Sequence, residues 1–292
     1  MRDFSADHRW LSINTATVRR QRGQDWPLLE IIEACAQRGI GAIAPWRDQV
    51  HAAGLAATAR AVRSHGLQLS GYCRGGMFTY ADGAGRQAAR EDNLRALDEA
   101  CELGAACLVL VVGGLPGALA GRAAHKDLAG AREQVREGVA ALLAEARGRA
   151  MPLAIEPLHP MYAADRACIN TLEQALDLCD ALDPARSGAL GVAVDVYHVW
   201  WDPKLPAQIA RAGRERLLAL HVCDWLTPTT DLLNDRGMMG DGVIDIRQIR
   251  GWVEEQGFAG YSEVEIFSAG NWWQRDGGAV LDTCIERHRQ CV

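Results

Sequence analysis

Four short apolar runs in the second half of the chain each end at an acidic or imidazole side chain. The clearest run covers residues 153–155 and ends at Glu156, with prolines close behind it. Proline cannot stay in a central ladder, so this pattern is typical of a buried strand that passes into a loop. The same pattern ends at Asp195, His221 and Glu265. Because the carboxyl ends of parallel strands meet at one edge, we expect these four side chains to lie together.

The rest of the chain alternates between strand-like runs and helical patterns. Strands are predicted at residues 11–17, 40–46, 67–73 and 107–112, with a loop at residues 74–76 after the third. Helical spacing of apolar residues predicts helices at about 27–38, 51–65, 86–103, 128–146, 171–182, 206–216, 246–257 and 280–285. Eight strand and helix units predict an α/β fold, a (β/α)8 TIM barrel that forms a single domain over residues 1–292. A doubly wound open sheet is the alternative, because sequence patterns leave the number of strands uncertain by about one or two.

The composition disfavours several classes of protein. Of 292 residues, 49% are hydrophobic and 23% are charged, which supports a large core and gives no sign of disorder. A net charge of -6 without a basic cluster disfavours nucleic acid as a partner. No leader-like stretch precedes Trp10, and the uncharged stretch at residues 103–121 is rich in glycine, so no membrane partner is expected. Nine cysteines without a paired C-x-x-C motif fit a reducing cytoplasm.

Competing barrel chemistries lack their characteristic residues. A Schiff-base aldolase needs a lysine at a strand end, but the two lysines, Lys126 and Lys204, lie in segments predicted to be helix or loop. There is no P-loop, no G-x-S-x-G elbow and no dinucleotide fingerprint coupled to a strand. The glycine-rich residues 113–117 are better explained as a tight loop than as a phosphate cup.

Glu156, Asp195, His221 and Glu265, called the quartet below, favour a metal site. Three carboxylates in one pocket would repel one another unless a cation lies between them. Oxygen ligands with one imidazole and no thiolate suit one divalent metal, Mn²⁺ first, with Mg²⁺, Co²⁺ or Zn²⁺ as alternatives. Each residue alone has a structural explanation, since a histidine at a strand end is often a hydrogen-bonding partner and a carboxylate there often caps a helix.

Short motifs occur at residues 153–160, 192–198, 220–224, 240–242 and 260–268. Together they resemble the xylose-isomerase-like barrel superfamily, in its sugar phosphate isomerase/epimerase branch; before residue 151 the likeness is architectural. The resemblance implies that the quartet binds one divalent metal, usually Mn²⁺, and that Glu156 and Glu265 also serve as acid and base. It further implies that His198 contacts a substrate hydroxyl and that Arg236 binds substrate.

Positions just past strand ends supply further candidates for substrate binding, namely His159, Trp225 and Arg74. Six of the nine tryptophans fall at or just past predicted strand ends, where flat apolar rings suit the C–H face of a sugar. Without a phosphate loop, an unphosphorylated polyol, keto-sugar or glycoside is favoured as substrate. Glu263 lies on the same strand face as Glu265 but one pleat deeper, so we interpret it as structural.

These features predict a metal-dependent sugar isomerase or epimerase. It would transfer a proton through an enediolate of a keto-sugar, a polyol-derived ketone or a sugar derivative. Loss of a β-hydroxyl from the same intermediate gives the first alternative, a lyase or dehydratase that is inosose dehydratase-like or cleaves keto-glycosides. A non-catalytic barrel subunit that binds sugar is the alternative from another class. The expected partner is a small carbohydrate, and the Trp272-Trp273 pair is compatible with a homo-oligomer.

Overall fold

The computed structural model describes residues 2–292, so that Met1 of the predicted domain lies outside the described residues. Within this range nine parallel strands form one sheet in the order β5-β4-β1-β13-β10-β9-β8-β7-β6. These strands are β1 (Leu11–Asn14), β4 (Ala42–Ala44), β5 (Gln68–Leu69), β6 (Tyr72–Gly76), β7 (Leu108–Val111), β8 (Leu153–Ile155), β9 (Leu190–Asp195), β10 (Leu217–Val222) and β13 (Ser262–Val264). Two short antiparallel pairs accompany them, β2 (Arg20–Gln21) with β3 (Gln24–Asp25) and β11 (Asp224–Trp225) with β12 (Arg236–Gly237).

The sheet closes into a barrel through β5 and β6, which share one position in the ring. β5 pairs with β4, β6 pairs with β7, and only Ser70 and Gly71 separate the two strands. Beyond β4, Trp46 forms a parallel bridge with Cys73 of β6, whose N–H donates to the Pro45 carbonyl at 3.1 Å. Nine strands therefore fill eight positions. The predicted (β/α)8 barrel is confirmed, and the alternative of an open sheet is wrong.

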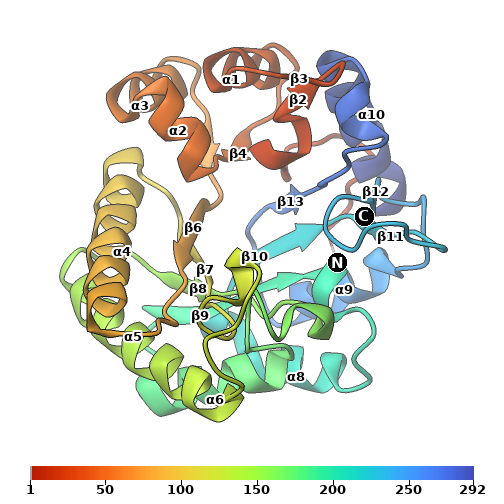
Figure 1. Ribbon diagram of the computed structural model, residues 1–292. Helices are drawn as coiled ribbons and strands as arrows, with labels where there is room; N and C mark the ends of the chain where they lie inside the picture. Colours follow the sequence, from red (N-terminus) through yellow and green to blue (C-terminus); the bar gives the residue numbers. More distant parts are fainter. Residues whose placement is uncertain (1) are drawn as a thin grey trace.

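Helices form a ring around the strands (Figure 1). They are α1 (Leu28–Gln37), α2 (Arg47–Ala53), α3 (Leu55–Ser64), α4 (Gly83–Leu103), α5 (Leu128–Gly148), α6 (Leu172–Leu182), α7 (Val196–Val199), α8 (Leu205–Arg216), α9 (Ile246–Glu255) and α10 (Gly277–Cys291), with 3₁₀ helices η1 (Thr15–Val18), η2 (Ala118–Ala120), η3 (Pro160–Tyr162) and η4 (Trp272–Gln274). The helix predicted at residues 51–65 is two helices, because Gly54 adopts a φ of +88° and interrupts the helical backbone. Between residues 2 and 292, none of the helices has both the length and the hydropathy that a membrane crossing requires.

Small side chains line the barrel interior beneath the carboxyl ends of the strands. Ala154, Ala193 and Ala219 belong to one buried cluster with Cys107 and Val109. Each alanine lies two residues before a member of the quartet and so faces the same side of its strand. This layer of small residues leaves room above it for long polar side chains.

Asp224 holds the segment that follows β10. Its buried carboxylate accepts hydrogen bonds from the backbone N–H groups of Gly240, Gly242 and Ile244 at 3.0, 2.9 and 3.0 Å. These bonds fix the glycine turn at residues 240–242. They also hold the start of β11 against the residues that follow β12, the strand that begins with Arg236 at the barrel mouth.

We expect Asp224→Asn to lower the free energy of unfolding by about 2 kcal/mol, because an amide has one acceptor oxygen and turns an N–H group toward backbone donors. Urea denaturation at pH 7 measures this loss. Asp241→Asn is the matched control in the same turn, since it removes only a partly exposed ion pair with Arg287 at 3.1 Å. The control should cost less than about 1 kcal/mol. Equal losses for the two variants would contradict the role given to Asp224.

Candidate metal centre

The quartet lies at one mouth of the barrel. Glu156 directly follows β8, Asp195 ends β9, His221 lies in β10 and Glu265 directly follows β13. One ligand atom from each residue lies within 4.8 Å of those of the other three. All four residues are buried, with exposed fractions from 0 to 5%. The structure therefore brings together the side chains that the sequence assigned to one sheet edge, while their roles as ligands stay a prediction.

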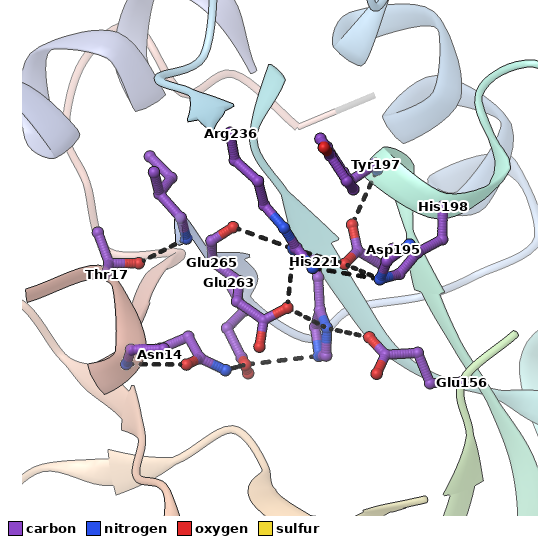
Figure 2. A network of polar contacts seen from close by, with 12 residues as sticks. Asn14, Thr17, Glu156, Asp195, Tyr197, His198, His221, Arg236, Glu263 and Glu265 are labelled. Atoms are coloured by element: carbon purple, nitrogen blue, oxygen red, sulfur yellow. Dashed lines mark hydrogen bonds and ion pairs between the residues drawn. The ribbon is translucent and has the colours of Figure 1, made fainter. Parts of the chain in front are cut away.

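Negative charge is concentrated in the quartet and is partly neutralised by Arg236. The Arg236 guanidinium donates through Nη1 to Asp195 Oδ2 and to Glu265 Oε2, each at 3.1 Å (Figure 2). Burial raises the pKa of Asp195 to about 6; Arg236 opposes this rise and Glu265 adds to it. Burial also raises the pKa of Glu265, against Arg236 and with the help of Glu156. Without a cation, these carboxylates therefore resist full ionisation.

His221 lies between Glu156 on one side and Glu263 and Glu265 on the other (Figure 2). Its Nδ1 is 3.0 Å from Glu156 Oε1, and its Nε2 is 3.4 Å from Glu263 Oε1. Burial disfavours the imidazolium, but the surrounding glutamates outweigh burial and hold the pKa of His221 well above its ordinary value. Metal ligation needs a neutral imidazole and ionised carboxylates, so a cation would displace this proton.

The donor set fits a divalent cation. The quartet offers three carboxylate oxygens and one imidazole nitrogen, and it contains no thiol. Such a set suits a hard ion such as Mn²⁺ or Mg²⁺, and Zn²⁺ also accepts histidine and carboxylate ligands. A cation among these atoms would relieve the repulsion that burial imposes on the carboxylates.

Glu263 supports His221 from deeper in the barrel. Its buried carboxylate accepts hydrogen bonds from Asn14 Nδ2 at 2.8 Å and from Ser70 Oγ at 2.7 Å. With Glu263 beside Nε2, the His221 ring is oriented so that Nδ1 faces the other members of the quartet. The residue thus has a structural task with a direct effect on the site. Nothing in the sequence pattern singles out its partners Asn14 and Ser70.

His198 lies one helical turn after Asp195, in α7. Asp195 caps this helix by accepting a hydrogen bond from the Tyr197 N–H at 2.8 Å. N–H donors face both ring nitrogens of His198. The backbone N–H of His159 lies 3.2 Å from Nδ1, and Arg236 Nη2 lies 3.2 Å from Nε2, which is also 3.5 Å from Asp195 Oδ2. Burial, and then Arg236, lower the pKa of His198 well below its ordinary value. The His198 ring is therefore neutral.

His159 and Trp225 form an aromatic stack beside the quartet. Their ring centroids are 4.9 Å apart with an interplanar angle of 29°, and Trp201 meets His159 edge-on at 5.8 Å. Burial lowers the pKa of His159, which keeps the stacked ring neutral near pH 7. Neither His159 nor Trp225 lines the pocket over the quartet. Their contact with substrate stays a prediction, whereas the contact of the His159 backbone with His198 belongs to the structure.

A pocket opens over the quartet. Glu156, Glu265, His198 and Arg236 line it, and so does Arg74, which was predicted to bind substrate. The remaining lining residues are Trp46, Met77, Val111, Leu158, Tyr162, Arg166, Leu233 and Phe267. Among these, Arg166 has no sequence signal, because it lies in the connection between β8 and α6 outside any strand end or motif.

A family model described as a xylose isomerase-like TIM barrel matches residues 32–284. A crystal structure of a protein from Sinorhizobium meliloti 1021 is 58% identical, covers 97% of this chain and 98% of that one, and has a TM-score of 0.90. The IolI protein with a bound zinc atom is 18% identical over 94% of each chain, with a TM-score of 0.73. D-psicose 3-epimerase with D-tagatose, from Clostridium cellulolyticum H10, is 16% identical over 94% of this chain and 97% of that one, with a TM-score of 0.70.

No curated protein sequence matches the chain. The two distant structures share its fold, and the family model covers most of its length. The resemblance predicted from the motifs is thereby confirmed, and the chain belongs to the family of xylose isomerase-like TIM barrels.

Proposed function

We propose that this protein is a divalent-metal-dependent sugar isomerase or epimerase. The convergence of the buried quartet carries the proposal, because a site that only bound sugar would have no need of three carboxylates and an imidazole around one point. Two fold neighbours support it, since one is an epimerase seen with a ketose and another is seen with zinc. The expected substrate is a small carbohydrate with a carbonyl beside a hydroxyl-bearing carbon. Free cysteines throughout residues 2–292 are consistent with a cytoplasmic location.

The chemistry that the quartet supports is proton transfer beside a carbonyl. When bound, the cation would supply positive charge to the two oxygens of an enediolate. Glu156 and Glu265 both line the pocket, so one can remove the proton and the other can return it.

Two neighbouring residues position the substrate in this proposal. Neutral His198 lines the pocket beside Arg236 and would contact a substrate hydroxyl there, while the His159 backbone holds its Nδ1. Arg236 holds Asp195 and Glu265 in place and presents its guanidinium to the same pocket. Return of the proton to the other face of the same carbon gives an epimer, and return to the neighbouring carbon interconverts aldose and ketose.

Solvent deuterium incorporation tests the proposed proton transfer. With Mn²⁺ added, we expect the wild type to exchange a C–H hydrogen of at least one member of a panel of keto-sugars. Glu265→Gln should slow this exchange by about 10²- to 10⁴-fold, because it removes an acid–base group. Mass spectrometry of the recovered sugar measures the rate. Glu133→Gln, an exposed position on α5, is the matched control and should exchange at the wild-type rate.

Unchanged exchange in Glu265→Gln would exclude this residue as acid or base. If Mn²⁺ binds tightly but no sugar in the panel exchanges, the enolising activity itself is excluded. That result would favour a barrel that binds sugar without turnover.

Calorimetric titration with Mn²⁺ tests the metal site separately from activity. We expect one site per chain, lost in His221→Ala. Glu263→Gln should weaken Mn²⁺ binding by about 10- to 100-fold, because it loosens the support of His221 without removing a ligand. Glu254→Gln is the matched control, since its carboxylate is also buried and paired with Arg2 but lies on α9. Equal affinities for the wild type and Glu263→Gln would show that Glu263 does not tune the site.

A further inference from the structure

Two arginines in the pocket over the quartet lack an effective partner. Arg74, in β6, makes no hydrogen bond to residues 2–292, and no carboxylate in that range lies within 4.0 Å of its guanidinium. Arg166 has one carboxylate near it, Asp165, at 3.8 Å from Nε, and its guanidinium lies over the Tyr162 ring at 5.8 Å from the centroid. The Nε of Arg166 is buried without a hydrogen-bond acceptor. Both side chains line the pocket that contains Glu156 and Glu265.

Other arginines near the barrel mouth are paired with carboxylates. Arg47 donates to both Asp92 and Glu99 at 2.8 to 3.1 Å, and Arg19 is paired with Asp48. Arg236 donates to two carboxylates of the quartet, those of Asp195 and Glu265. Carboxylates therefore neutralise the other three guanidinium groups near this mouth of the barrel. Arg74, which has no such partner, is an exception.

Arg74 is half-buried. Its guanidinium therefore loses part of its hydration without gaining an acceptor, which is unfavourable. Burial lowers the pKa of Arg74, and repulsion from Arg166 lowers it further. A pair of like charges at one pocket wall is typical of a site that receives an anion.

Position places this anion outside the metal site. The carboxylates of the quartet would have a divalent cation and Arg236 as counter-charges, and Glu263 adds a further carboxylate beside His221. Arg166 has Asp165 near it, whereas no carboxylate of the described residues contacts the Arg74 guanidinium directly. A substrate with a negative group would give Arg74 the direct partner that a neutral sugar would not.

We infer that the substrate carries an anionic group, a carboxylate or a phosphate, which Arg74 and Arg166 receive while the carbonyl end lies over the quartet. This inference rests on the proposed function. The rest of the wall suits the carbon chain between the two ends, because Trp46, Met77 and Phe267 line the same pocket. Trp46, Arg74 and Met77 also border an adjoining cavity of about 370 Å³, which gives the anionic group room. The substrate class is therefore a keto-sugar acid or a keto-sugar phosphate.

Three ligands with one carbon skeleton test the inference: D-fructose, D-fructuronate and D-fructose 6-phosphate. Their dissociation constants are measured by calorimetry with the Mn²⁺-loaded wild type, Arg74→Gln, Arg166→Gln and the double variant. We expect at least one charged ligand to bind the wild type tenfold or more tightly than D-fructose. The double variant should lose this preference while its affinity for D-fructose changes less than threefold. The charged ligand with the lower dissociation constant shows whether the site prefers a carboxylate or a phosphate.

Two controls separate a binding role from a structural or a general charge effect. Arg136→Gln removes an exposed arginine on α5 and should keep the full preference for charged ligands. Arg74→Gln should leave the ligand-free thermal midpoint unchanged or raise it, because the substitution removes a half-buried charge that has no partner. A structural role for Arg74 would instead lower the midpoint.

Equal binding of all three ligands to the wild type would overturn the inference, as would a preference that survives in the double variant. These outcomes are distinct from failure of the proposed function. A preference for anions that depends on both arginines, without deuterium exchange in any sugar, would overturn only the enolising activity. Exchange in D-fructose without any preference for charge would overturn only the anionic substrate.

Discussion

Mutual repulsion among buried carboxylates is the constraint on which this structure depends. In a flexible chain the three acidic side chains of the quartet would move apart into water. Here each is attached to the end of a different parallel strand, and hydrogen-bonded neighbours on both sides hold these strands in register. The barrel therefore enforces a concentration of negative charge that local interactions alone would not permit, and a cation is the simplest species to neutralise it.

Supports from remote parts of the chain make this arrangement tolerable. Below the quartet, Glu263 is held by Asn14 and Ser70, which come from the first and third positions of the barrel. At its side, Arg236 begins β12, and Asp224 anchors the residues that follow this strand. Closing the barrel is what brings these groups together, so the candidate metal centre depends on the whole ring and not only on the four strands that supply the quartet.

The quartet could be predicted from sequence because each member ends an apolar run, and strand ends in a parallel barrel meet. The barrel itself followed from the count of strand and helix units. Details set by backbone geometry could not be predicted in this way. Residues 74–76 were expected to form a loop, yet β6 continues to Gly76, so that Arg74 lies within a strand. Similarly, the sequence pattern places Gly54 inside one predicted helix at residues 51–65, but its positive φ divides this segment into two helices.

The direction in which side chains in loops point could also not be predicted from the sequence. His159 and Trp225 fall just past strand ends, and position alone directs both of them toward a pocket. In the structure they stack on each other, because two flat rings gain more from mutual contact than from exposure. Arg166 shows the opposite case, since its place in a connection between β8 and α6 gives no hint that it reaches the pocket over the quartet.

Arg236 and Arg74 show how the two halves of the barrel divide the work of the proposed site. Both guanidiniums line one pocket, but Arg236 lies between carboxylates from β9 and from the end of β13, whereas Arg74 has no such partner. The first serves the charge balance of the quartet, and the second remains available to a ligand. The quartet comes entirely from β8 onward, while Trp46, Arg74 and Met77 of the pocket wall come from the first half. In the proposed site, the second half of the barrel would therefore hold the cation, and the first half would supply the part of the wall that meets the anionic group.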